Sequence, residues 1–181
     1  MTCVVGIEHE GRVILGADAA GTAGWSQTIR ADPKVFSNGP FIMGFTSSFR
    51  MGQLLRYKLE APVPTRTDLK DLDRFVATTF IDAVRKTFND NGYGKIDNNR
   101  EHGGCFLVGV AGRLFTIDND YQTGRSIAGY DAVGCGDDIA LGSLHTTAQY
   151  AISPRQRATL ALEAAAALSA GVAAPFTFVE A

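Results

Sequence analysis

Short apolar runs separated by small polar turns open the chain, a pattern typical of β-hairpins. Four such runs form two pairs, residues 3–8 with 12–17 and residues 34–36 with 40–45. The first pair flanks a polar turn at Gly11, and the second flanks Ser37-Asn38-Gly39, in which Asn-Gly is a strong turn signal. The first quarter of the chain therefore predicts two antiparallel hairpins.

Apolar residues then recur at helical spacing, every three or four positions. The sequence predicts four helices, over residues 48–59, 69–89, 137–150 and 155–170. Ser153 and Pro154 mark the start of the last helix, since Ser is a good N-cap and Pro suits the first helical position. Further strands are predicted at residues 105–110, 113–117, 128–133 and 175–180, and loops at 18–28 and 90–104.

The order of these elements predicts an α+β fold in which helices and strands form separate packed layers. A length of 181 residues suits a single domain spanning 1–181. Hydrophobic residues make up 45% and charged residues 20% of the sequence, as expected for a soluble globular protein.

Charge and composition exclude several classes of function. A formal net charge of -2 gives no electrostatic basis for binding nucleic acid or an anionic membrane surface. No apolar run is long enough to span a bilayer, and the first residues do not resemble a secretory signal. The three cysteines are widely spaced, and the three histidines show no metal-ligand spacing with them. We therefore expect a cytoplasmic protein with reduced thiols and no metal site.

Thr2 is the first residue with candidate chemistry. Removal of Met1 exposes its α-amine, which has a reference pKa of about 7.7–8.0 and can act as a base for its own hydroxyl near neutral pH. A Thr at this position is common and by itself carries no function. Cys3 is a rival nucleophile, but two residues have to be removed to expose it, and we interpret it as a buried strand cysteine.

Asp18 and Lys34 follow at the end of the second predicted strand and at the start of the third. A lysine near a hydroxyl lowers the pKa of that hydroxyl, and an aspartate keeps the lysine charged and oriented. Taken alone, an Asp and a Lys more often form a surface salt bridge of little energetic value, and the spacing does not choose between the two interpretations.

The three positions together resemble the N-terminal half of proteasome β subunits and of the bacterial protease HslV. The matching pattern is Thr2-Cys3-Val4-Val5-Gly6, Gly16-Ala17-Asp18, Gly21-Thr22-Ala23-Gly24 and Lys34-Val35, with no gap in the spacing. The resemblance implies a four-layer αββα sandwich of the N-terminal nucleophile (Ntn) hydrolase type.

The resemblance also implies roles for individual residues. Thr2 is the expected nucleophile, Lys34 lowers the pKa of the Thr2 hydroxyl, and Asp18 pairs with Lys34. The backbone N–H of Ser48 falls where the family has an oxyanion-hole glycine. Substrate-binding positions fall at Gly21, Thr22 and Thr46, although for Thr22 and Thr46 an ordinary loop or strand threonine is an equally valid interpretation.

The match returns at Gly134-Cys135-Gly136, where Cys135 replaces a serine that bonds near the nucleophile's amine in the family. Cysteine is a poorer hydrogen-bonding group than serine. The family also has an aspartate three residues before a serine near the end of the last helix. Ser169 fits that serine, but Ala166 stands at the aspartate position. These departures affect the expected activity more than the expected fold.

The resemblance thus implies a threonine protease that cuts peptides inside a self-compartmentalising homo-oligomeric ring, and the proposed chemistry needs no metal or organic cofactor. The resemblance implies an AAA+ ATPase partner that unfolds protein substrates. Two alternatives remain open, a catalytically weak or inactive assembly protein with the same fold and an amidase for small substrates.

Overall fold

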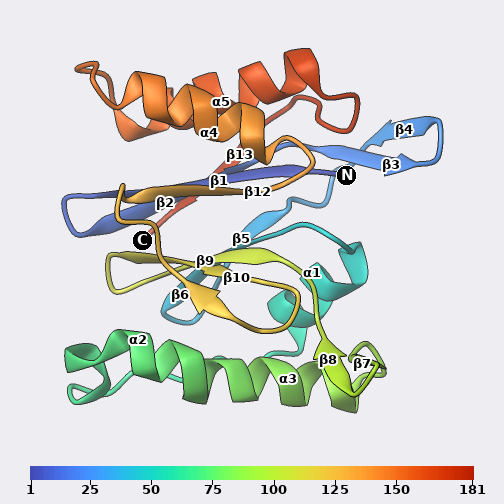
Figure 1. Ribbon diagram of the computed structural model, residues 1–181, viewed down its shortest axis with the longest axis vertical. Coiled ribbons are helices and arrows are strands. Elements are labelled where there is room, and N and C mark those ends of the chain that lie inside the picture. The colour runs from blue at the N-terminus through green and yellow to red at the C-terminus, as the bar shows by residue number, and fades with distance from the viewer.

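The computed structural model describes all residues from 1 to 181 and has four layers stacked along its long axis (Figure 1). Helices α4 (Asp137–Thr147) and α5 (Pro154–Leu168) cover one face of a four-stranded sheet. A five-stranded sheet packs on the other face of the first sheet, and the remaining helices cover its outer side. The α+β class and the αββα layering expected from the sequence are therefore confirmed.

The first sheet is antiparallel throughout and has the strand order β12-β1-β2-β13. Its strands are β1 (Cys3–His9), β2 (Arg12–Ala17), β12 (Tyr130–Gly134) and β13 (Thr177–Glu180). The tight β1–β2 hairpin places the start of β1 beside the end of β2, because Val4 pairs with Ala17.

The second sheet is also antiparallel and has the order β11-β10-β9-β6-β5. Its strands are β5 (Val35–Asn38), β6 (Phe41–Phe45), β9 (Phe106–Val110), β10 (Arg113–Ile117) and β11 (Thr123–Gly124). The Asn-Gly turn predicted between β5 and β6 is present, with Gly39 at φ +56°.

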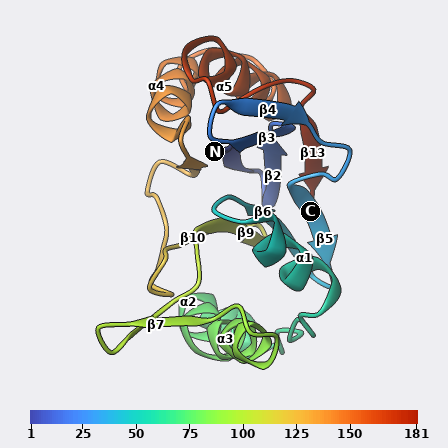
Figure 2. The ribbon, with the colours of Figure 1, turned by 90° about the vertical axis from the view of Figure 1, so that its right-hand side faces the viewer.

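Both segments predicted as loops contain a small hairpin, so those two predictions were wrong. The hairpins are β3 (Ala20–Ala23) with β4 (Ser26–Ile29), and β7 (Lys95–Asp97) with β8 (Arg100–His102). Most of their side chains are exposed, so the sequence shows no alternation of apolar and polar residues to mark these strands. In Figure 2, the β7–β8 hairpin projects from the helical layer beneath the second sheet.

The predicted helix over 69–89 is divided into pieces. A 3₁₀ turn at Asp68–Lys70 precedes α2 (Leu72–Phe75), which continues through a π-helical turn at Val76–Phe80 into α3 (Ile81–Asp90). Asp71 separates the first two pieces, because its φ of -138° is not helical and its side chain accepts a hydrogen bond from the Arg74 N–H. The helix predicted over 48–59 is observed as α1 (Phe49–Tyr57).

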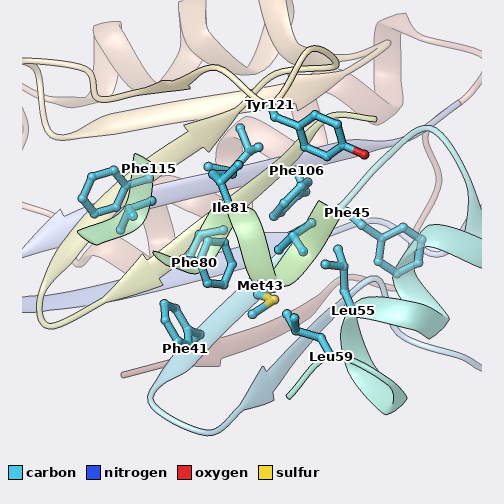
Figure 3. Packing of buried hydrophobic residues seen from close by; sticks show 14 of the residues in the cluster. Phe41, Met43, Phe45, Leu55, Leu59, Phe80, Ile81, Phe106, Phe115 and Tyr121 are labelled. Atoms are coloured by element: carbon cyan, nitrogen blue, oxygen red, sulfur yellow. The ribbon is translucent and has the colours of Figure 1, made fainter. Parts of the chain in front are cut away.

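Three apolar clusters fill the spaces between the four layers. The largest has 20 buried residues and joins the second sheet to α1, α2 and α3 (Figure 3). A second, rich in alanine, lets α5 lie close on the first sheet through Ala158, Ala161 and Ala165. A third lies between the two sheets. At the far end of β1, Glu8 accepts a hydrogen bond from the Leu114 N–H at 2.7 Å and so links the two sheets.

We expect Phe80→Ala to lower the free energy of unfolding by about 3–5 kcal/mol, the usual cost of truncating a buried phenylalanine. Phe80 has no exposed surface, and its ring stacks on Phe41 with centroids 4.6 Å apart (Figure 3). Thr79→Ala, on the exposed face of the same turn, is the matched control. Chemical denaturation measures both variants, and equal stabilities would contradict the packing described here.

Candidate active site

The fold brings Thr2, Asp18 and Lys34 to one end of the space between the two sheets. Thr2 directly precedes β1, and Asp18 directly follows β2 on the neighbouring strand of the same hairpin. Lys34 directly precedes β5 and reaches the pair from the opposite sheet. Strand ends close in space thus explain why residues sixteen positions apart in sequence can meet.

Lys34 is the central group of this cluster. Its Nζ donates a hydrogen bond to Thr2 Oγ1 at 2.9 Å and another to Asp18 Oδ1 at 2.7 Å. The exposed fractions are 5% for Thr2, 1% for Asp18 and 0% for Lys34. A salt bridge on the protein surface, the alternative left open by the sequence, is therefore ruled out.

Three backbone N–H groups fix the Asp18 carboxylate. Oδ1 accepts from Cys3 at 3.0 Å, while Oδ2 accepts from Ala20 at 2.8 Å and from Ala173 at 3.3 Å. A buried carboxylate needs such donors because it has lost its hydration. The contact with Ala173 could not be expected from the sequence, since the two residues lie 155 positions apart.

Burial lowers the pKa of the Lys34 ammonium from its ordinary value, because the charged form has lost its water. The hydrogen bond and the negative charge of Asp18 act in the opposite direction. The Lys34 ammonium lies 5.9 Å from the centroid of the Phe49 ring. The site therefore holds a shielded cation against the Thr2 hydroxyl.

The thiol of Cys135 lies beside the backbone nitrogen of Thr2. Thr2 N donates to Cys135 Sγ at 3.3 Å, and Cys135 Sγ lies 3.5 Å from Ser169 Oγ. With Met1 attached, the Thr2 hydroxyl donates to the Met1 carbonyl oxygen at 2.5 Å. The sulfur thus occupies the position next to the nitrogen that becomes the α-amine once Met1 is removed.

Gly134 allows this close approach of β12 to the start of β1. Its φ is +112°, and a Cβ at this position would collide with the carbonyl group of Thr2. Cys3, the rival nucleophile, is fully buried, and burial raises the pKa of its thiol to about 12. A thiol in that state is a poor nucleophile near neutral pH.

Ser48 caps the N-terminus of α1 with φ -148° and ψ 133°, angles that any residue can adopt. Its backbone N–H, the expected oxyanion donor, donates to the Thr46 carbonyl oxygen at 2.6 Å. In this conformation the Ser48 N–H is bonded within the protein and is not free to bind a substrate oxygen.

The three expected substrate-binding residues lie on, or directly after, two strands. Gly21 and Thr22 belong to β3, and the Thr22 hydroxyl oxygen is buried without a hydrogen-bond partner. Thr46 directly follows β6 and is buried. Their contact with substrate remains a prediction.

Sequence reasoning missed the neighbouring pair Arg30 and Asp32. The Arg30 guanidinium makes two hydrogen bonds of 2.8 Å to Asp32 and lies 4.2 Å from the centroid of the Phe49 ring. Two opposite charges two positions apart in a polar segment give no signal in the sequence.

No group of three or more His, Cys, Asp or Glu side chains is arranged to hold a metal ion. No helix combines the length and apolar character needed to cross a membrane.

We expect Asp18→Asn to lower the free energy of unfolding by about 3–5 kcal/mol at neutral pH, because the Lys34 ammonium loses its buried counter-charge. Asp18 raises the Lys34 pKa, so Asp18→Asn lowers the pKa of Lys34 in the folded protein further. In the unfolded chain the lysine keeps its ordinary pKa of about 10.4. As pH rises toward that value, Lys34 of the folded variant loses its proton first, so the loss of stability relative to wild type becomes smaller. Denaturation across neutral to alkaline pH measures this dependence.

Asp82→Asn is the matched control, because the side chain of Asp82 is 69% exposed in its pair with Arg85. A loss for Asp18→Asn that is as small as the control's, or that grows with pH, would contradict the buried ion pair.

No protein-family model matches the sequence, and the search of curated proteins finds no match. Solved structures are similar over nearly the full length. BPH from Thiobacillus denitrificans in complex with epoxomicin has a TM-score of 0.81 at 17% identity, covering 99% of this chain and 98% of that one. A second BPH structure has a TM-score of 0.77 at 16% identity, covering 99% and 97% of the two chains.

Eukaryotic HslV from Trypanosoma brucei has a TM-score of 0.73 at 16% identity, covering 99% of this chain and 98% of that one. Structural similarity at such low sequence identity shows a shared fold. The fold that the resemblance implied is therefore confirmed, and the chain has the HslV-like fold of these structures.

Proposed function

We propose that the chain is a threonine-type N-terminal nucleophile hydrolase that cuts amide bonds in peptides after Met1 is removed. The observation that carries the proposal is the bond of 2.9 Å from Lys34 Nζ to Thr2 Oγ1, made by a fully buried lysine that also pairs with Asp18. A buried cation held against a hydroxyl stabilises the oxyanion form of that hydroxyl.

Removal of Met1 changes two groups at once. The backbone nitrogen of Thr2 becomes an α-amine, 3.3 Å from Cys135 Sγ in the present geometry. The Thr2 hydroxyl also loses its hydrogen bond to the Met1 carbonyl and is left with the contact to Lys34. The amine then takes the hydroxyl proton, directly or through a water molecule.

The proposed reaction uses these groups in turn. Thr2 Oγ1 forms a bond to the substrate carbonyl carbon, the amide C–N bond breaks, and the leaving amine receives the proton held by the Thr2 amine. Water then attacks the resulting ester, which releases the acid and restores the hydroxyl. Lys34 stabilises the negative charge that develops on Oγ1, and Asp18 keeps Lys34 charged and directed at it.

Further parts of the proposal rest on the resemblance to HslV. We place the protein in the cytoplasm, in a homo-oligomeric ring that encloses peptide or protein substrates, with an AAA+ ATPase as a partner. Gly21, Thr22 and Thr46 contact the substrate in this proposal, and the unpartnered Thr22 hydroxyl favours that role.

We expect the active protein to begin at Thr2 and to gain the mass of epoxomicin on its first peptide. The compound is chosen because it is bound in the BPH structure. Thr2→Ala and Lys34→Ala remove peptide hydrolysis, since each deletes a member of the hydrogen-bonded group. Intact mass spectrometry, peptide mapping and turnover of fluorogenic peptides measure these effects.

Thr79→Ala, which changes an exposed helix residue, is the control and keeps wild-type turnover and labelling. A purified protein that keeps Met1 and forms no adduct would rule out the proposal.

The Thr2→Ala variant and a substrate panel separate the two alternatives. The engaged N–H of Ser48 favours a non-catalytic assembly protein, because it leaves no free oxyanion donor in this conformation. For such a protein, ring formation proceeds equally in wild type and Thr2→Ala, and neither shows turnover. An amidase for small substrates reacts with epoxomicin but cleaves small amides in preference to peptides, which a substrate panel detects.

We expect a bell-shaped dependence of kcat/KM on pH, because the mechanism needs a neutral Thr2 amine and a charged Lys34. The acidic limb reflects the amine, with a reference pKa of about 7.7–8.0. The alkaline limb lies below the ordinary lysine value of about 10.4, because burial lowers the Lys34 pKa. Activity that stays constant above the ordinary lysine pKa would contradict the role of Lys34.

A further inference from the structure

The backbone at Thr46, Ser47 and Ser48 forms an unusually tight turn. The Ser48 N–H donates to the Thr46 carbonyl oxygen, two residues earlier, at 2.6 Å. Ser47, between them, has a φ of +62°. A bond from residue i+2 to residue i across a positive φ defines the rarer form of the γ-turn, which is strained for any residue except glycine.

A neighbouring segment holds Ser47 in this conformation. The Ser47 hydroxyl oxygen accepts a hydrogen bond from the Cys105 N–H at 3.1 Å, and the Thr46 N–H donates to the Cys105 carbonyl oxygen at 3.2 Å. Gly104 packs closely against the turn, since a Cβ there would lie 3.3 Å from the Ser47 side chain. The hydroxyl of Ser47 therefore offsets part of the strain of its own backbone.

We propose that Ser47 is a positioning residue that sets the direction of the Ser48 N–H, and that the γ-turn is the resting form of the oxyanion loop. The inference rests on the proposed function. In the reaction, the backbone rotates about Ser47, so that Ser47 leaves positive φ and the Ser48 N–H leaves the Thr46 carbonyl. The N–H then donates to the oxygen that becomes negative when Thr2 attacks.

Two observations support such a rotation. Ser48 has extended backbone angles at the N-terminus of α1, so it carries no left-handed strain in the resting form. The start of α1 has no acidic residue in its first turn, and helix N-termini favour negative charge nearby. The strain at Ser47 makes the resting form easier to leave, while the bond from Cys105 retains it.

Two substitutions at Ser47 distinguish the effect of its hydroxyl on kcat from the effect of its backbone strain. Ser47→Ala removes the bond to Cys105 but keeps a Cβ at positive φ, so the resting form is weakened. We expect kcat to rise about fivefold with KM unchanged, the size of effect given by one hydrogen bond. Ser47→Gly removes the hydroxyl and also the strain, because glycine accepts positive φ. Its kcat therefore stays below that of Ser47→Ala.

Steady-state kinetics on a fluorogenic peptide measure both variants, with Ser37→Ala, exposed on β5, as the control that keeps wild-type values. If Ser47 only supports the fold, kcat falls in both variants or changes equally in both. Either result, or a kcat for Ser47→Ala equal to wild type, would overturn the inference while the adduct at Thr2 still supports the hydrolase. A wild-type protein without adduct refutes the hydrolase, and this inference with it.

A structure of the wild-type protein bound covalently to epoxomicin tests the same point without a variant. We expect the Ser48 N–H to have left the Thr46 carbonyl, and Ser47 to have a negative φ. A bound structure that keeps the γ-turn unchanged would overturn the inference even if Ser47→Ala does not fold.

Discussion

The buried ion pair of Lys34 and Asp18 is the interaction on which the site depends. An ammonium group without exposed surface is stable only if a carboxylate and other acceptors replace its water. Asp18 belongs to the first sheet and Lys34 to the second, so the pair joins the two sheets at one end. The apolar cluster between the sheets sets their separation, and that separation brings Lys34 within bonding distance of Thr2.

The same arrangement explains why the chemistry lies at the end of a hairpin. A nucleophile in the middle of β1 would be covered by the second sheet on one face or by α5 on the other, whereas Thr2 precedes the first paired residue, Cys3. At this point β12 comes close through Gly134, and Cys135 follows beside the Thr2 nitrogen. The thiol of Cys135 therefore makes a contact in this position, and the contact is weaker than one made by a hydroxyl.

The strand pattern could be predicted because it depends on local sequence, whereas the grouping of Thr2, Asp18 and Lys34 was expected from the family resemblance, since Lys34 comes from the other sheet. Hairpin geometry fixes which residues meet at strand ends, and apolar runs mark the strands. The β3 and β4 strands could not be predicted, since their side chains are largely exposed. The division at Asp71 was also missed, because the helical spacing of apolar residues continues through it. The state of the Ser48 N–H depends on the backbone angle of Ser47, which serine seldom adopts.

The hydrogen bond from the Ala173 N–H to Asp18 gives the last part of the chain an unexpected importance. Ala173 lies between α5 and β13, and its carbonyl oxygen also accepts from the Ala19 N–H at 2.9 Å. Ala173 thereby belongs to the structural support of the carboxylate. A protease that trimmed the C-terminal strand, or a fusion that pulled it away from β2, would therefore disturb an electrostatic centre built mainly from the first 34 residues.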